Sequence, residues 1–350
     1  MTEELTTQDK ELLNSVNHCT KFDVVIIGGG VAGLSAGIYA ARDGFKTLIL
    51  EGTVESSVDA PGGALLLTSD IENFPGFIQG EGAELVNIIR TQAENFGATI
   101  KEERAAKIEA GLQIGEMHKI WTTDGNEYCA RTIILATGAV ARRLGIPGED
   151  ELYGRGVSTC ATCDGFFFRE KNVAVVGGGD TAVEDALLLT RYAKSVTLVV
   201  RGSEFRASGP EAREILKHPD VNILWESTVE QVVPTKDGNA VDHILVKNKD
   251  NTVTPLDVDG LFVAIGSDPA TGFLKDSVIQ TDSDGYILTV DGSTRVQGAV
   301  PGVFAAGDAA DRVFRQAITS AGRAVEAALE ARAYINAGVS APISRETDKY

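Results

Sequence analysis

The stretch KFDVVIIGGGVAGLSAGIYAARDGFKTLILEG, residues 21–52, decides the fold. A β-branched run at 24–27 predicts a strand, small residues then predict a helix, and 47–50 predicts a second strand ending at Glu51. The turn between strand and helix has the pattern G-x-G-x-x-G, formed by Gly28, Gly30 and Gly33. The glycines let a pyrophosphate approach the helix N-terminus, and Glu51 can accept a hydrogen bond from a ribose hydroxyl. A glycine-rich loop alone is a weak signal for a nucleotide site. Here the strand, the helix, the second strand and the terminal acid all match the pattern of a dinucleotide-binding motif. The stretch therefore predicts a site for FAD or NAD.

The pattern returns in NVAVVGGGDTAVEDALLLTRYAKSVTLVVRGSEFRAS, residues 172–208. Strands are predicted at 173–176 and 196–200, and the turn after the first strand holds Gly177, Gly179 and Ala182. Arg201 follows the second strand, with Arg206 nearby, where the first motif has an acid. Guanidinium groups pair with a 2′-phosphate, so this second site favours NADPH. The alternative is that both arginines are ordinary solvated surface residues. Their position at the end of the strand, where a ribose would lie, disfavours this alternative.

The composition is typical of a soluble globular protein. A chain of 350 residues, 43% hydrophobic and 23% charged, is long enough for two domains and has no apolar run of membrane-spanning length. The net charge of -18 disfavours a nucleic-acid partner. The N-terminal stretch is polar and lacks the basic and apolar regions of a secretory signal, so we expect a cytoplasmic protein without a membrane anchor.

The cysteines of TCATCDG, residues 159–165, are predicted to be a redox couple. Zinc needs about four ligands, whereas Cys19 and Cys129 stand alone in the sequence and the four histidines are scattered, so no metal is expected. A structural disulfide across two residues would stabilise little, and a reducing compartment would tend to open it. Cys160 and Cys163 therefore fit a redox pair, with Asp164 near enough to relay a proton to a leaving thiolate.

Two dinucleotide motifs in one chain indicate that electrons pass between two bound dinucleotides, from a nicotinamide to a flavin. The segments at 131–139 and 260–269 each predict an apolar strand followed by a glycine turn, and we expect them to be crossings and hinges between two domains. Asp308 follows another predicted strand and can bind ribitol hydroxyls. A long alanine-rich helix is predicted to open near Arg315 and Gln316, where its N-terminus would stabilise a reduced flavin.

These motifs together resemble the low-molecular-weight thioredoxin reductases, a family of homodimeric FAD enzymes with a Cys-Ala-Thr-Cys-Asp centre. The resemblance covers residues 22–336 and rests, in chain order, on GGGVAGLSAG, PGG, ENFPGF, ILATGA, CATCDG, GGGDTAVEDAL, FRAS and GD…D…RQAITSAG. It implies an α/β fold of two nested Rossmann-like nucleotide-binding domains, doubly wound and three-layered, with a discontinuous FAD domain. It also implies electron transfer from NADPH through FAD and the cysteine disulfide to oxidised thioredoxin.

The resemblance implies a role for each matching position. Cys163 would lie beside the flavin, Cys160 would attack the substrate disulfide, and Asp164 would serve as acid and base. FAD would be held by Gly28, Gly30, Gly33, Glu51, Gly63, Asn73, Asp308, Arg315, Gln316 and Ala317. NADPH would be held by Gly177, Gly179, Thr181, Arg201 and Arg206. A rotation of the NADPH domain would present the disulfide and the nicotinamide to the flavin in turn.

The implied domains are a flexible acidic extension at 1–20, an FAD-binding domain at 21–141 and 271–338, an NADPH-binding domain carrying the disulfide at 142–270, and a tail at 339–350. The chain departs from the family pattern at four residues. Val200 and Gly202 flank Arg201 where the family commonly has His-Arg-Arg, which removes a cation and predicts a weaker preference for NADPH over NADH. Ala64 replaces a glutamine and Ser267 replaces a histidine, each with the loss of one expected contact.

Two other functions fit parts of the pattern. One is a flavin disulfide reductase for another thioredoxin-like or glutaredoxin-like acceptor. An alkyl hydroperoxide reductase flavoprotein would carry an additional N-terminal redox domain, for which the residues before the first motif are too few. The other is a non-catalytic flavin redox sensor, which would bind FAD without rapid reduction by NADPH. In a sensor, Asp164 and the second nucleotide motif would have no evident use.

Overall fold

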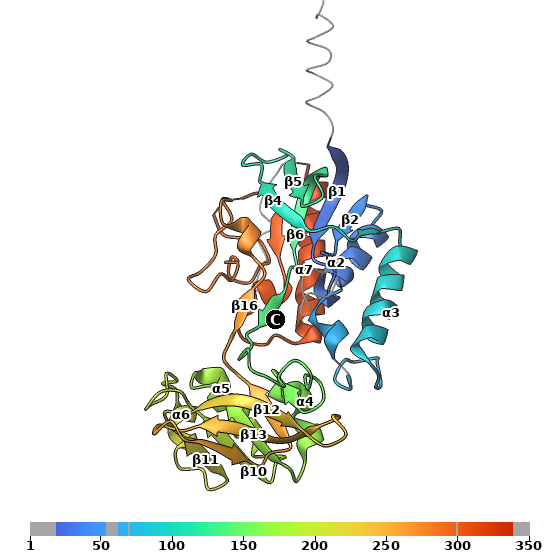
Figure 1. Ribbon diagram of the computed structural model, residues 1–350. Coiled ribbons are helices and arrows are strands. Elements are labelled where there is room, and N and C mark those ends of the chain that lie inside the picture. The colour runs from blue at the N-terminus through green and yellow to red at the C-terminus, as the bar shows by residue number, and fades with distance from the viewer. Residues whose placement is uncertain (1–18, 54–61, 69–70, 299, 339–350) are drawn as a thin grey trace, which may run out of the picture. The chain divides into compact units, whose positions relative to one another are not determined.

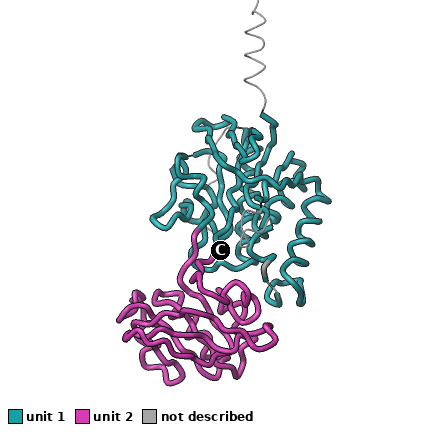
Figure 2. Tube along the Cα trace, in the orientation of Figure 1, with its two compact units in different colours: residues 1–140, 269–350 teal, residues 141–268 magenta. Residues whose placement is uncertain are grey.

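The computed structural model describes residues 19–53, 62–68, 71–298 and 300–338 (Figure 1). The chain forms two compact units, coloured separately in Figure 2. Unit 1 consists of the described residues up to Val140 and from Pro269 onward, and unit 2 is Ala141–Asp268. The crossings between units fall in two short strands, β7 (Ala139–Ala141) and β16 (Ser267–Pro269). Most of the expected N-terminal extension and the whole expected tail lie outside the described residues.

Unit 1 contains a seven-stranded sheet. Its strands are β1 (Thr20–Ile27), β2 (Thr47–Leu50), β3 (Thr99–Lys101), β4 (Ala105–Glu109), β5 (His118–Thr122), β6 (Glu127–Leu135) and β17 (Val303–Ala305). They lie in the order β3-β2-β1-β6-β5-β4, and β17 pairs with β6 as well. Strands β1, β2, β3, β6 and β17 are parallel, whereas β4 and β5 form an antiparallel hairpin against β6. The parallel strands place their carboxyl ends at one edge of the sheet.

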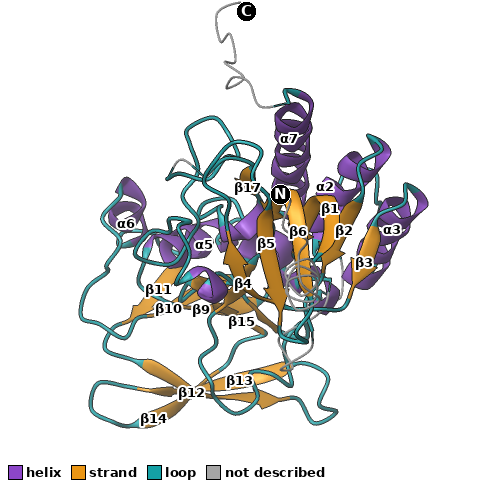
Figure 3. Cartoon of the chain, turned by 90° about the horizontal axis from the view of Figure 1, so that it is seen from above, coloured by secondary structure: helices purple, strands orange, loops and turns teal. Residues whose placement is uncertain are grey.

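Alternate residues of β1 belong to two cores on opposite faces of this sheet. Val24 and Ile26 pack with helices α2 (Val31–Arg42), α3 (Gly82–Asn95) and α7 (Ala317–Asn336). The alanine-rich faces of α2 and α7 let these two helices pack closely, and Figure 3 shows all three helices beside the sheet. Val25 and Ile27 pack on the other face, against residues of the 274–300 segment. The first βα turn is therefore anchored in a core on each side.

Unit 2 repeats the arrangement with a five-stranded parallel sheet in the order β11-β10-β9-β15-β8. Its strands are β8 (Val157–Ser158), β9 (Asn172–Val176), β10 (Ser195–Val199), β11 (Val221–Leu224) and β15 (Gly260–Val263). One face packs against helices α4 (Ala161–Asp164), α5 (Asp180–Leu189) and α6 (Pro210–Ile215). The other is covered by an antiparallel sheet of β12 (Thr228–Pro234), β13 (Val241–Lys247) and β14 (Val253–Leu256). The predicted α/β fold of two Rossmann-like units, one of them discontinuous, is confirmed.

Candidate active site

The cysteine pair lies at the start of helix α4 in unit 2. Cys160 and Cys163 are joined by a disulfide, with their Cα atoms 5.3 Å apart, and both are half-buried. Cys160 caps the helix, because its Sγ accepts a hydrogen bond of 3.2 Å from the backbone N–H of Cys163. A hydrogen-bond donor favours the charged form of its acceptor. Once the disulfide is reduced, this contact favours a thiolate at Cys160.

Asp164 closes the same helical turn. Its backbone N–H donates a hydrogen bond of 3.1 Å to the carbonyl oxygen of Cys160. Ser158 supports the turn from the other side, since its Oγ accepts from the Cys160 N–H over 3.0 Å. The turn that carries both sulfur atoms therefore carries a half-buried carboxylate as well. The acid–base role of Asp164 stays a prediction.

The first glycine turn joins β1 to α2 in unit 1, and two of its glycines are required by the protein itself. A Cβ at Gly28, where φ is +117°, would lie 2.1 Å from the carbonyl oxygen of Ala136. A Cβ at Gly33 would lie 1.8 Å from the carbonyl oxygen of Gly28. Neither position tolerates a side chain, because both approaches are to backbone atoms.

Gly30 differs from its two neighbours in the motif. Its φ of -75° suits any residue, and a Cβ there would meet, among the described residues, the Gly63 Cα at 3.6 Å and the Gly62 oxygen at 3.7 Å. The packing of the described residues therefore leaves room at the N-terminus of α2, where backbone N–H groups attract a phosphate. This space fits the pyrophosphate of FAD, and the turn of Gly62 and Gly63 borders it.

Glu51 follows β2 directly, as predicted, and its side chain is only 8% exposed. It forms an ion pair with Arg90 of α3, a partner that sequence reasoning missed. A Cβ at Gly29 would lie 2.2 Å from the Glu51 Cβ, so this glycine is what lets Glu51 approach the turn. Asn73 is exposed in the loop before α3. The binding of FAD by Glu51 and Asn73 stays a prediction.

Asp308 lies after β17 and is brought to the first glycine turn by its neighbour Gly307. A Cβ at Gly307 would lie 2.9 Å from the Cβ of Ala32, which belongs to the first turn of α2. Ser320 of α7 donates a hydrogen bond of 2.9 Å to Asp308 Oδ1. Burial raises the pKa of the Asp308 carboxyl, and the charge of Asp311 acts in the same direction, while Ser320 and Arg315 act against them. Hydroxyl donors such as those of a ribitol chain would stabilise this poorly hydrated carboxylate.

Helix α7 begins in a turn that is fixed by its own side chains. Gln316 is the N-cap, and Thr319 completes a capping box with it. Arg315 has a φ of +48°, uncommon for a residue other than glycine, and its N–H donates to Asp311 Oδ2 over 3.1 Å. The predicted FAD residues Arg315, Gln316 and Ala317 are thus held together at the positive end of the helix dipole.

The second glycine turn joins β9 to α5 in unit 2 and reproduces the first. At Gly177 a Cβ would lie 2.4 Å from the Ala264 oxygen and 2.6 Å from the Cβ of Ala182, so this pair packs tightly. A Cβ at Gly179 would meet, within the described part of the chain, only the Nη2 of Arg206 at 3.8 Å. Thr181 lies in the first turn of α5. Gly179, like Gly30, therefore leaves room for a phosphate.

Arg206 is held beside this turn by its backbone, because its N–H donates to the Gly178 oxygen over 2.7 Å. Arg201 follows β10 and is exposed, as is Arg206. Val200 is only 2% exposed, and a Cβ at Gly178 would lie 3.0 Å from its Cγ1. Its departure from the family pattern is therefore explained, because Val200 packs into the unit 2 core. Nothing in the structure explains the departures at Ala64, Gly202 and Ser267.

Comparison with known proteins agrees with this geometry. The pyridine nucleotide-disulphide oxidoreductase family matches residues 22–328, which include both glycine turns and the cysteine pair. The chain belongs to this family. Its identity as a pyridine nucleotide-disulphide oxidoreductase accounts for two nucleotide turns and a redox-active cysteine pair in one chain, and family members use FAD and NADPH.

Relatives of this pyridine nucleotide-disulphide oxidoreductase carry a more specific name. A thioredoxin reductase of Rickettsia conorii is 41% identical over 315 residues, which are 89% of this chain and 98% of the relative. The mitochondrial thioredoxin reductase 1 of Arabidopsis thaliana is 44% identical, over 89% of this chain and 83% of the relative. A crystal structure of thioredoxin reductase from Streptococcus pyogenes superposes with a TM-score of 0.82 at 38% identity, over 91% of this chain and 99% of that one.

Sequence reasoning missed two aromatic residues of this oxidoreductase that follow the cysteine pair. Phe166 and Phe167 are 47% and 36% exposed, whereas Phe168 is buried. The two exposed rings meet edge to face with centroids 6.3 Å apart, and the guanidinium of Arg169 lies over Phe166. The Phe-Phe-Phe run was a usable signal, because three aromatic residues in succession cannot all enter one core. Exposed aromatic side chains beside a reactive site are typical of protein-binding surfaces.

The interpretation of Cys19 and Cys129 as isolated cysteines is wrong. The structure joins them in a second disulfide within unit 1, although they are 110 residues apart in the sequence. Sequence alone could not pair them, because the pairing of β1 with β6 is what brings them together. Among the described helices, none is both long enough and apolar enough to span a membrane.

Proposed function

We propose that the protein is an NADPH-dependent thioredoxin-disulfide reductase. The observation that carries the proposal is the Cys160–Cys163 disulfide, in the same chain as two glycine turns that leave room for phosphate groups. Relatives named thioredoxin reductase, 41–44% identical over 89–90% of this chain, support the same reaction. The overall reaction consumes NADPH, a proton and oxidised thioredoxin, and yields NADP⁺ and the thioredoxin dithiol.

The two cofactors are assigned to the two units. FAD is bound by unit 1, at the turn of Gly28 to Gly33 and by Asp308 with the N-terminal turn of α7. NADPH is bound by unit 2, at the turn of Gly177 to Gly179, with Arg201 and Arg206 on its 2′-phosphate. FAD, when bound, takes a hydride from NADPH and supplies an electron pair for reduction of a disulfide.

The cysteines carry the rest of the reaction. Two electrons and two protons convert the Cys160–Cys163 disulfide to a dithiol. The Cys160 thiolate, favoured by the Cys163 N–H, attacks the thioredoxin disulfide and forms a mixed disulfide. Cys163 then attacks the Cys160 sulfur, which restores the internal disulfide, and Asp164 gives a proton to the departing thioredoxin thiolate.

The remaining assignments concern the location, the oligomeric state and the partner protein of the enzyme. We place it in the cytoplasm, as a homodimer, with thioredoxin as its partner protein. The relatives named thioredoxin reductase support the choice of thioredoxin over a glutaredoxin-like acceptor.

The direct test of the function is NADPH oxidation by the purified FAD-loaded protein with oxidised thioredoxin as the acceptor. We expect loss of nicotinamide absorbance that depends on thioredoxin, with one thioredoxin dithiol formed per NADPH consumed. Equal rates with and without thioredoxin, or turnover with a glutaredoxin only, would reject thioredoxin as the substrate.

Replacing Phe166 with alanine is expected to weaken thioredoxin binding without changing flavin reduction. The ring is 47% exposed beside the cysteine pair, and an interfacial aromatic residue commonly contributes ~1–2 kcal/mol. The KM for thioredoxin should therefore rise ~5–30-fold, while the rate of FAD reduction by NADPH stays the same. Phe96 is the matched control, because it is 45% exposed but lies in unit 1. Equal effects of Phe166→Ala and Phe96→Ala on KM would argue against a docking role.

Replacing Gly30 with alanine is expected to weaken FAD binding but leave the fold intact. The new Cβ has only ordinary contacts with the described protein, yet it fills the space assigned to the pyrophosphate. Overpacking costs ~1–3 kcal/mol, so the dissociation constant for FAD should rise ~5–150-fold. Fluorescence titration of the apoprotein with FAD and a thermal unfolding curve measure the two quantities. Gly33→Ala is the comparison, because its Cβ collides with the backbone and should lower the unfolding midpoint itself.

A further inference from the structure

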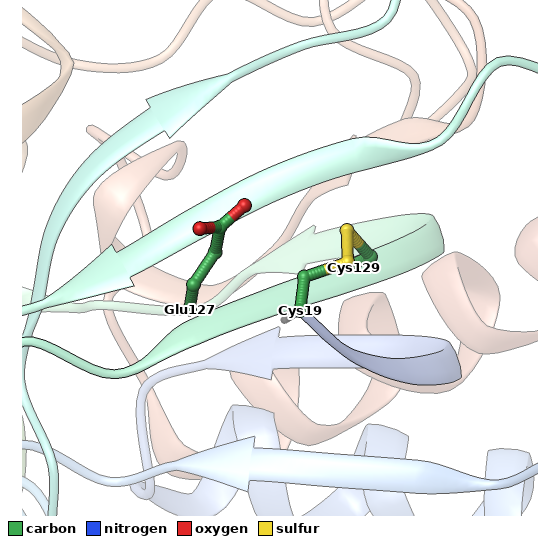
Figure 4. A group of neighbouring side chains, drawn as sticks. All are labelled: Cys19, Glu127 and Cys129. Atoms are coloured by element: carbon green, nitrogen blue, oxygen red, sulfur yellow. A yellow bond between two sulfur atoms is a disulfide. The ribbon is translucent and has the colours of Figure 1, made fainter. Parts of the chain in front are cut away.

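A second pair of cysteines lies in unit 1, and the proposed reaction does not use it. Cys19 is the first described residue and directly precedes β1, whereas Cys129 lies on β6. Their Cα atoms are 5.5 Å apart, within the range of disulfides, and the two sulfur atoms are bonded (Figure 4). Glu127 lies beside them, with its carboxylate and the two sulfur atoms all within 4.8 Å of one another.

The strand register explains why these side chains meet. Lys21 of β1 is paired with Cys129 of β6, and alternate residues of a strand share a face. Cys19 precedes Lys21 by two positions and Glu127 precedes Cys129 by two, so all four lie on one face. Lys119 of β5 is also paired with Cys129 and joins them there. On β4, Glu109 is paired with Lys119, and Lys107 is paired with Trp121, which is itself paired with Glu127. This face therefore carries two cysteines, two carboxylates and three ammonium groups.

The pair is remote from the glycine turn of its own unit. It lies at the amino end of β1, whereas the turn follows the carboxyl end, and β1 has eight residues. At the rise of an extended strand, the separation is about 26 Å. Electron transfer at the flavin therefore has no direct use for Cys19 or Cys129.

We propose that Cys19 and Cys129 form a reversible thiol–disulfide modification site, closed by low-molecular-weight disulfides and opened by low-molecular-weight thiols. With oxidised glutathione as the oxidant, the Cys19 thiolate attacks one sulfur atom and releases one glutathione thiolate. The Cys129 thiolate then attacks the Cys19 sulfur and releases the second. Two protein thiols lose two electrons to the glutathione disulfide, and the two protons leave with two glutathione thiols.

Burial decides the order of these steps. Cys19 is half-buried, so a small disulfide can reach it, whereas Cys129 is only 4% exposed and suits the internal second attack. Lys21, Lys107 and Lys119 favour a thiolate on this face, and Glu109 and Glu127 oppose it. Cys19 is half-buried in the closed form itself, so a small thiol can reach its sulfur and open the bond.

Closing the pair also changes the fold's stability, because the bond fixes the start of β1 to β6 and closes a long loop. The two cysteines are 110 residues apart. A cross-link of that span removes much of the conformational freedom of the unfolded chain. The oxidised form should therefore unfold roughly 5–10 °C above the reduced form.

The test uses the full chain with Cys160→Ser/Cys163→Ser, which leaves Cys19 and Cys129 as the only thiols. The protein is equilibrated in mixtures of oxidised and reduced glutathione, quenched with acid, denatured and labelled with a maleimide of high mass. We expect two labels per chain in the most reducing glutathione mixture and none in the most oxidising mixture. Both labels should disappear over the same range of mixtures, because closing the pair is a single two-electron step. The same variant with Cys129→Ser should instead acquire one glutathione, on the accessible Cys19, and show no oxidation-dependent change in unfolding midpoint.

Three results would overturn the proposal. Two labels at every ratio of oxidised to reduced glutathione would show that the pair does not close. No label at any ratio, with labels appearing only after a strong dithiol reductant, would make the bond a permanent cross-link. One zinc ion per chain in native mass spectrometry, with both thiols protected from oxidation, would make the cluster a metal site with Glu127. Peptide mapping of the unmodified oxidised protein, which should yield a linked Cys19–Cys129 peptide, keeps the test independent of the serine variants.

Discussion

Replacing Cys160 with serine is expected to abolish thioredoxin reduction while NADPH still reduces the bound FAD. A serine hydroxyl does not attack a disulfide at neutral pH, so turnover should fall by roughly 10⁴-fold or more. FAD reduction needs only the two nucleotides, and its rate should stay within the range of the unmodified enzyme. Steady-state turnover with thioredoxin and the rapid loss of flavin absorbance measure the two steps separately.

Cys163→Ser is the matched variant, because it removes the other half of the same disulfide. It also stops turnover, but it leaves the Cys160 thiol that forms the mixed disulfide and removes the thiol that resolves it. A stable adduct of thioredoxin with this variant should therefore accumulate when oxidised thioredoxin is added. An adduct with Cys160→Ser, and none with Cys163→Ser, would reverse the assigned order of the two cysteines.

Replacing both Arg201 and Arg206 with alanine is expected to remove the preference for NADPH over NADH. Arg206 is held beside the Gly178 oxygen, and its guanidinium lies 3.8 Å from the open position above Gly179. A hydrogen bond to a charged group contributes ~1.5–3 kcal/mol. Each arginine should therefore change the KM for NADPH ~10–150-fold, and the double variant should change it by more than either single variant.

The comparison nucleotide is NADH, whose kcat/KM should be nearly the same in all these variants because it has no 2′-phosphate. Arg213 of α6 is a suitable control, as an exposed arginine of the same unit away from the glycine turn. An equal loss with NADPH and NADH would show that the arginines support the fold of the turn and do not recognise the phosphate.

The sequence predicted the parts of the fold that local patterns determine. Both glycine turns lie between strand and helix as predicted, since Gly28 and Gly177 need positive φ and close backbone approach whatever surrounds them. The cysteine pair could be interpreted because Cys160 and Cys163 lie in one helical turn. Such signals need no knowledge of distant residues.

The features that depend on distant residues could not be predicted. Cys19 meets Cys129 only because β1 pairs with β6, and Glu51 meets Arg90 only because α3 and β2 contribute to the same core on one face of the sheet. The departure at Val200 had no explanation until the side chain was seen in the core of unit 2. The predicted domain boundaries and the individual cofactor contacts stay predictions, and the variants at Gly30, Arg201 and Arg206 test three of the contacts.

In the proposed reaction, electrons pass from NADPH through FAD and the Cys160–Cys163 pair to thioredoxin. The most direct test mixes the purified FAD-loaded protein anaerobically with NADPH in a stopped-flow instrument, and then with oxidised thioredoxin. We expect rapid loss of oxidised-flavin absorbance with NADPH, a slower loss with NADH, and return of this absorbance when thioredoxin is added. No loss with either nucleotide, or no return with thioredoxin, would contradict the proposed reaction.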